Sequence, residues 1–137
     1  MTFLVERLGE IRKHLAHLRK LQPRVKGVEA LQKDLSLHND VLFSLLTVCQ
    51  LVIDIASELS TRRGLKIEDY TEAIRNLGAY PEFPPEIVAA LARLPGFRNV
   101  VVHEYVTLDL NRAVDALRQI EPVEAFARIV SEIEGRA

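Results

Sequence analysis

The stretch from Val28 to Leu59 constrains the fold of this 137-residue chain more than any other segment. Its apolar residues recur every three or four positions along two seams, which predicts a long helix that is apolar on two faces. A helix of this kind has to pack against several neighbours, so we expect it to be the central element. One seam comprises Leu31, Leu35, His38, Leu42, Leu45, Cys49, Val52, Ala56 and Leu59, and the other Leu37, Val41, Val48, Leu51 and Ile55.

The other segments predict shorter helices and no β-sheet. Val100–Val102 has local strand propensity, but no other segment could pair with it, so we expect a helical turn or an irregular segment buried against the bundle. Pro122 should kink or divide the last helix. The chain is therefore expected to form one all-α domain over residues 1–137, a bundle of about five helices. The expected helices run from about Thr2 to Leu21, Val28 to Leu59, Glu68 to Leu77, Pro85 to Leu94, and from Asp109 onward.

Composition narrows the functional classes without selecting one. Hydrophobic residues make up 48% and charged residues 27%, which is typical of a soluble globular domain. The most apolar run, Val41–Ala56, is too short and too polar to span a bilayer, and charges from Glu6 onward leave no signal-peptide core. We therefore expect a cytoplasmic protein that makes no membrane contact. Cys49 should be a buried, unreactive thiol, and no Cys/His cluster has zinc-ligand spacing, so we expect neither a metal nor another cofactor.

Charge is unevenly distributed along the chain. The net charge is −1, yet residues 1–26 carry seven basic and two acidic side chains, a net charge of +5. A basic first helix could attract RNA or an acidic partner surface. The solvated face of an amphipathic helix explains the same pattern, and the sequence leaves both interpretations open.

The candidate site is the succession Arg98, His103 and Tyr105 within Phe97–Tyr105. Arginine supplies a permanent cation whose planar fork fits phosphate oxygens. Histidine exchanges protons near neutral pH. Cleavage of a phosphodiester uses both roles, and the tyrosine adds a nucleophilic hydroxyl at the same edge. The alternative is a structural histidine beside a surface arginine.

The spacing of these residues carries a geometric problem. On one ideal helix, Arg98 and His103 would lie about 140° apart, whereas Arg98 and Tyr105 would nearly eclipse. One regular helix therefore does not direct the arginine and the histidine at one phosphate. Either the backbone leaves helical geometry between Val101 and Tyr105, or residues from two chains converge.

The block Phe97-Arg98-Asn99-x-x-Val102-His103-x-Tyr105, with Asp109 four residues after the tyrosine, resembles the signature of HEPN-domain ribonucleases. Among these it is most similar to the HepT toxins, which work with a minimal nucleotidyltransferase as antitoxin. The resemblance extends over most of the chain, because it includes the length, the long apolar second helix, the Gly/Pro-rich middle and the closing helix.

The resemblance implies a HEPN-like bundle and a metal-independent endoribonuclease that cleaves RNA. Arg98 and His103 would be catalytic, and Asn99 would support them by a hydrogen bond to Arg98, to His103 or to the backbone. A homodimer would assemble the active site, and the antitoxin would neutralise the toxin by attaching AMP to Tyr105. Two alternatives stay open: a catalytically weak HEPN module that pairs with a nucleotidyltransferase, and a structural helical dimer.

Overall fold

The computed structural model describes residues 2–135, and these residues form α-helices and short 3-10 helices (η) without a strand. The predicted all-α class is therefore confirmed. The α-helices are α1 (Phe3–Leu21), α2 (Val28–Lys33), α3 (Leu35–Arg62), α4 (Tyr70–Arg75), α5 (Pro85–Leu91), α6 (Leu94–His103), α7 (Leu110–Arg118) and α8 (Glu121–Gly135). The 3-10 helices are η1 (Gln22–Arg24), η2 (Asn76–Ala79) and η3 (Tyr105–Thr107).

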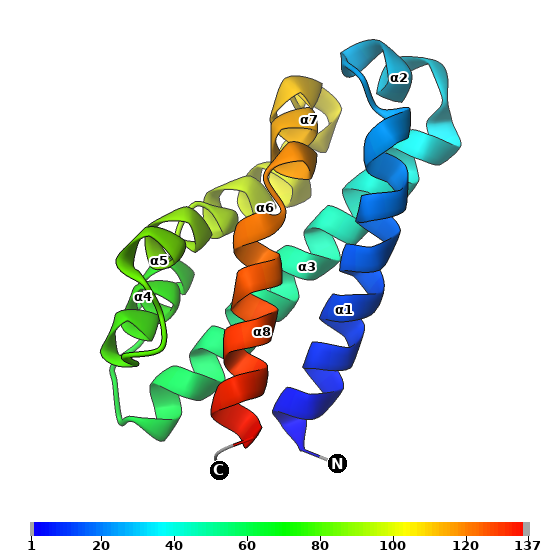
Figure 1. Cartoon of the computed structure of the whole chain (residues 1–137). Helices are drawn as coiled ribbons and strands as arrows, with labels where there is room; N and C mark the ends of the chain where they lie inside the picture. The colour runs from blue at the N-terminus through cyan, green and yellow to red at the C-terminus, as the bar shows by residue number, and fades with distance from the viewer. Residues whose placement is uncertain (1, 136–137) are drawn as a thin grey trace.

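The long helix α3 is the central element, as predicted. It packs against α1, α2, α4, α6 and α7, while α8 packs against α1 and α5. Figure 1 shows α1 and α8 in front of α3, with both ends of the chain at one end of the bundle. By length and composition alone α3 could cross a membrane, but half of its most apolar 18-residue window is buried inside the bundle. Core helices of soluble proteins share this character.

The helix predicted over Val28–Leu59 is divided at Asp34, which corrects the prediction. Asp34 has extended backbone (φ −129°, ψ 103°), and its Oδ1 accepts a hydrogen bond from the Leu37 amide at 3.1 Å. It therefore caps a new helix. The apolar seam does not continue across the break, and Leu35 is 73% exposed. At the other end, Gly64 (φ 66°) closes α3 in the left-handed conformation that glycine adopts without strain.

The motif segment belongs to a regular helix of 10 residues, whereas a helical turn or an irregular segment was expected. Pro95 occupies the first turn of α6, where a missing N–H costs little. The valines continue the helix because Phe97 and Val101, one turn apart, are both buried, and this packing outweighs the local strand preference. The expected burial of the whole segment is wrong, since residues 102–106 are exposed.

The division predicted at Pro122 is confirmed. Asp109 accepts a hydrogen bond from the Asn111 amide at 2.9 Å and caps α7, which ends at Arg118. Pro122 then lies in the first turn of α8, which starts at Glu121. Two separate helices result, and only the second lies along α1.

Candidate active site

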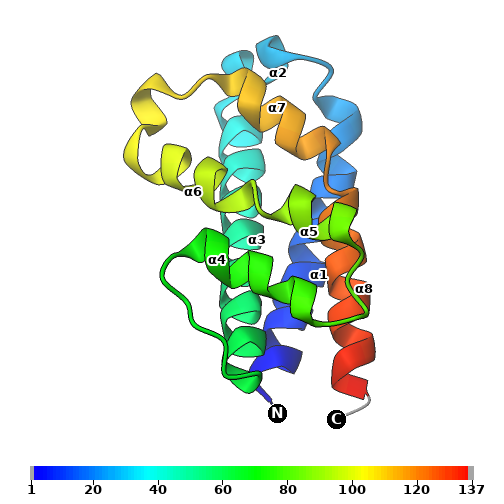
Figure 2. The ribbon, with the colours of Figure 1, turned by 90° about the vertical axis from the view of Figure 1, so that its left-hand side faces the viewer.

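The motif lies on a helix that packs directly on α3. Phe97 and Val101 point α6 into the core, so the residues between them and beyond them reach the surface. Figure 2 shows α6 crossing α3, with the segment that follows α6 at the edge of the molecule and away from α8. The fold therefore presents one face of α6 and the whole of η3 to solvent.

Three elements hold the Arg98 side chain. Its Nε donates to Oε1 of Gln50 on α3 at 3.2 Å, and its Nη1 donates to Oδ1 of Asn99 at 3.0 Å. Its guanidinium carbon lies 5.6 Å from the ring centroid of Tyr70, at the start of α4. The contact of Asn99 with Arg98 is one of those expected for it. Gln50 and Tyr70 were not anticipated, because neither lies near Arg98 in the sequence.

The positive charge of Arg98 is not neutralised by this environment. Within residues 2–135, no carboxylate lies within 4.0 Å of its guanidinium nitrogens. The hydrogen bonds come from neutral amide oxygens, and the outer edge of the fork at Nη2 has no hydrogen-bond partner among the described residues. A half-buried guanidinium in this state is suited to bind an anion from solvent.

His103 and Tyr105 differ from Arg98 in being exposed. His103 ends α6, and neither its ring nor the Tyr105 hydroxyl has a hydrogen-bond partner in the described part of the chain. Tyr105 is 70% exposed, so its ring does not pack on the bundle within one chain. Glu104 between them is also exposed.

The backbone leaves helical geometry within the predicted interval between Val101 and Tyr105, but only after His103. Helical geometry is kept through His103 and is lost only at Glu104 (φ −133°, ψ 30°). Arg98 and His103 are therefore about 140° apart around one regular helix and do not converge. The change at Glu104 also means that Tyr105 does not lie on the same helix as Arg98, so their near-eclipsed relation is absent.

Apolar side chains are exposed on the elements that carry the motif. Phe43 on α3 is 65% exposed, and Val102 and Val106 next to His103 and Tyr105 are 40% and 83% exposed. Isolated exposed apolar residues are common on soluble proteins. Here they lie on α3 and on α6–η3, the same elements that hold Gln50, Arg98 and Tyr105.

Cys49 is buried, as predicted. It is 2% exposed, and burial raises the pKa of its thiol to about 12, an effect that the nearby Arg98 guanidinium offsets only in part. In the range 2–135, no three His, Cys, Asp or Glu side chains gather closely enough to hold a metal ion.

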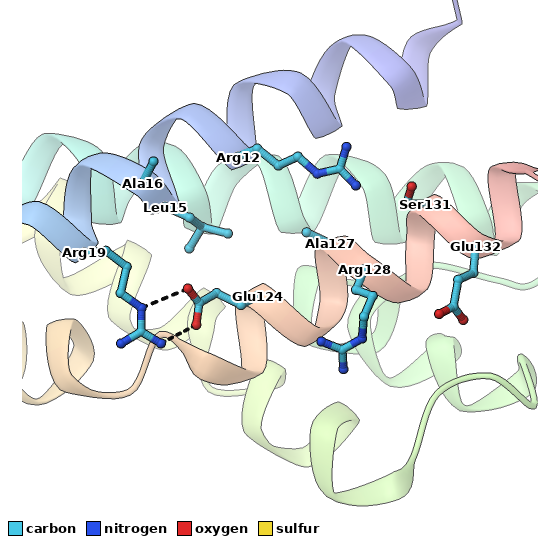
Figure 3. Close-up of a pocket in the computed structure, with 9 residues that line it drawn as sticks. All are labelled: Arg12, Leu15, Ala16, Arg19, Glu124, Ala127, Arg128, Ser131 and Glu132. Carbon is cyan, nitrogen blue, oxygen red and sulfur yellow. Dashed lines mark hydrogen bonds and ion pairs between the residues drawn. The ribbon is translucent and has the colours of Figure 1, made fainter.

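Part of the basic charge of α1 lies away from the motif, at a groove between α1 and α8. Arg12 and Arg19 line a groove of about 460 Å³ between α1 and α8, together with Arg128 (Figure 3). Glu124 on α8 forms hydrogen bonds to Arg19 across this groove. None of the motif residues lines it. The groove thus carries a mixed charge, and the ion pair fastens α1 to α8.

Comparison with known proteins gives the family. The model of the family described as HepT-like ribonucleases matches residues 11–130, which is most of the chain. The chain belongs to this family. The resemblance inferred from Phe97–Tyr105 is therefore confirmed.

Two curated proteins are similar to this HepT-like chain. A provisionally named RNase of Archaeoglobus fulgidus is 31% identical over 87 residues, which cover 64% of this chain and 66% of that protein. The mRNA nuclease HepT of Shewanella oneidensis is 26% identical over 101 residues, which cover 72% of this chain and 76% of that protein.

Solved structures share the fold. A tri-AMPylated HEPN toxin of S. oneidensis, in complex with its MNT antitoxin, superposes with a TM-score of 0.81 at 20% identity, over 96% of this chain and 99% of that one. A toxin–antitoxin structure with AMP-PNP gives a TM-score of 0.81 at 19% identity, over 96% and 98%. At this identity the likeness establishes the HEPN bundle.

We expect Cys49 of the folded chain to resist alkylation at about pH 8, because its raised pKa leaves almost no thiolate to react. Intact-mass spectrometry after incubation with iodoacetamide measures this directly. The same chain in denaturant is the control and should be modified within minutes. Rapid modification of the folded chain would contradict the buried placement of Cys49.

Proposed function

We propose that this HepT-like chain is the toxin of a toxin–antitoxin pair and a metal-independent endoribonuclease. Arg98 and His103 are its catalytic groups, and AMP attached to Tyr105 neutralises it. One observation carries this proposal. Hydrogen bonds to neutral groups fix the Arg98 guanidinium without cancelling its charge, and the imidazole of His103 and the phenol of Tyr105 are exposed to solvent. The family and the mRNA nuclease activity named for its S. oneidensis relative support it.

The chemistry requires only these side chains and RNA. His103 removes the proton from a ribose 2′-hydroxyl, and the 2′-oxygen attacks the adjacent phosphorus. The P–O5′ bond breaks, and the 5′-oxygen takes up a proton from water, which leaves a 2′,3′-cyclic phosphate and a 5′-hydroxyl. Arg98 stabilises the charge that develops on the phosphate oxygens. DNA lacks the 2′-hydroxyl and is not a substrate for this route.

Two chains form each site in this proposal. Because Arg98 and His103 diverge on one intact helix, the His103 that serves a given Arg98 comes from a second copy of the chain. The exposed apolar side chains Val102 and Val106 are chain neighbours of His103 and Tyr105, and Phe43 lies two turns before Gln50 on α3. A second copy that packs on these elements would cover them. A two-fold axis then produces two equivalent sites.

The antitoxin is a small nucleotidyltransferase that uses ATP. The similar S. oneidensis toxin is AMPylated and complexed with an MNT antitoxin, which supports this choice of partner. In this chain the Tyr105 hydroxyl is exposed and beside His103, so AMP attached there would bring a bulky anion to the site. It would block RNA by volume and by charge repulsion.

The proposal predicts RNA cleavage by the purified chain that persists in excess EDTA. Arg98→Ala and His103→Ala should each lower the rate at least about a hundredfold, because general acid–base catalysis and charge stabilisation are each worth factors of this size. Gel analysis of a labelled RNA measures the rate and identifies the cyclic phosphate end. Circular dichroism of both variants should match the wild type. Loss of cleavage in EDTA that added Mg²⁺ restores would contradict the mechanism.

A shared site predicts complementation between two inactive variants. Co-expressed Arg98→Ala and His103→Ala chains should recover about a quarter of the wild-type activity. Random pairing makes half of all dimers heterodimers, and one of the two sites in each heterodimer has both wild-type residues. A site within one chain would recover nothing.

Phe43→Glu should yield a monomer by light scattering and abolish cleavage, because it places a charge in the proposed contact. Ala16→Glu, which adds the same charge in the groove between α1 and α8, is the matched control and should stay dimeric. A monomeric wild-type chain at micromolar concentration would overturn the two-chain arrangement.

Co-expression with a cognate nucleotidyltransferase should add the mass of AMP to the peptide that contains Tyr105. Tyr70 and Tyr80 are the internal controls, and Tyr80 should stay unmodified because it is buried and donates its hydroxyl to the Leu59 carbonyl at 2.8 Å. Modification restricted to Tyr70, or full neutralisation of a Tyr105→Phe chain by the partner and ATP, would show that Tyr105 is not the acceptor.

A further inference from the structure

Gln50 makes two hydrogen bonds that connect Arg98 to a second residue on α3. Its Oε1 accepts from Arg98 Nε at 3.2 Å, and its Nε2 donates to Asp54 Oδ1 at 3.0 Å. Asp54 lies one turn beyond Gln50 on α3, so both side chains project from the same helix face. Gln50, Asp54 and Arg98 are all half-buried.

The two partners leave one possible orientation for the Gln50 amide. An ionised carboxylate only accepts hydrogen bonds, and a guanidinium only donates them. Asp54 therefore takes the NH₂ group, and the carbonyl oxygen faces Arg98. Without Asp54 the amide could turn its NH₂ group toward the guanidinium, where two donors would oppose each other.

We propose that Gln50 and Asp54 are positioning residues that set the direction of the Arg98 fork. The inference rests on the proposed function, because it assigns Arg98 to the phosphate. Gln50 holds Nε while the outer edge of the fork at Nη2 stays open, and Asp54 holds Gln50 in the orientation that allows this. An amide orients the cation without cancelling its charge. A carboxylate at position 50 would instead pair with Arg98 and compete with the phosphate.

The carboxylate of Asp54 acts on Arg98 only through Gln50. It lies more than 4.0 Å from every guanidinium nitrogen of Arg98 and of Arg7. Arg7 lines a shallow pocket together with Asp54, and its guanidinium stacks on the Phe3 ring. Glu58 is the other charged group lining that pocket. Among the described residues, the Asp54 carboxylate accepts its hydrogen bond from Gln50, which ties this acid to the candidate site.

The test compares five variants of the full chain. Gln50→Met removes both hydrogen bonds at similar length, Gln50→Glu keeps the acceptor but adds a charge, and Asp54→Leu removes only the outer contact. Asp54→Asn can still accept from Gln50. Ser57→Ala, two turns along the same face, is the matched control, because its hydroxyl bonds only to the Ile53 carbonyl of its own helix.

Two measurements separate positioning from structural support. The first is the arginine Nε–H region of the ¹H–¹⁵N spectrum, with the Arg98 signal assigned by Arg98→Lys. The second is kcat and KM for RNA cleavage, with thermal unfolding recorded for each variant. A merely structural contact between α3 and α6 would change the unfolding temperature and leave kcat of the folded chain unaltered.

We expect Gln50→Met and Asp54→Leu to lose the slowly exchanging Arg98 Nε–H signal and to lower kcat roughly 10- to 100-fold, the cost of a misplaced catalytic group. Gln50→Glu should keep the signal yet lower kcat, because the cation is neutralised. Asp54→Asn and Ser57→Ala should resemble the wild type in both measurements.

An unchanged Arg98 signal in Gln50→Met, or full kcat in Gln50→Met or Gln50→Glu, would overturn the inference while cleavage by the wild type still supports the proposed function. A wild-type chain that does not cleave RNA would instead overturn the proposed function. The Arg98 Nε–H signal would then decide by itself whether Gln50 and Asp54 orient this arginine.

Discussion

The burial of α3 is the constraint on which the rest of the structure depends. Val52, Ile55 and Leu59 are fully buried on it, and fully burying each such side chain contributes about 1.5–3 kcal/mol. Most other helices pack on α3, so their positions are set relative to it. Phe97 and Val101 seat α6 in the same core, and this seating places Arg98 opposite Gln50. The candidate site is thus a consequence of core packing.

Arg98 differs from the ion-paired arginines of the chain. A hydrogen bond to Glu124 raises the pKa of Arg19, and hydrogen bonds to Glu134 and Glu58 raise that of Arg62. Those pairs fasten helices together, since Glu124 and Glu134 both belong to α8. The Arg98 guanidinium donates hydrogen bonds only to neutral amide oxygens among the described residues. Holding a half-buried cation without a counter-charge costs stability, and the same arrangement keeps the full charge available to an anion.

Much of the fold could be predicted from local pattern, and each error has an identifiable physical cause. The first helix, the central position of α3, the start of a helix at Asp109 and the break at Pro122 were all predicted correctly. The break at Asp34 was not predicted, and Val100–Val102 belong to a full helix where a helical turn or an irregular segment was expected. At Asp34 a side-chain cap starts a new helix within the apolar pattern, and in α6 the burial of Phe97 and Val101 outweighs the strand preference of the valines.

The sequence alone determined the helical periods, the order of Arg98, His103 and Tyr105, and their divergence on a regular helix, because these are properties of a single segment. Only the tertiary structure decided which groups meet Arg98 and which motif side chains face solvent. Gln50 lies 48 positions away from Arg98, and no local pattern marks the pair. Contacts between distant segments depend on how all the apolar faces pack together. The exposure of Tyr105 has the same origin, since Val101 is the last residue of α6 that packs in the core and α6 ends two residues later.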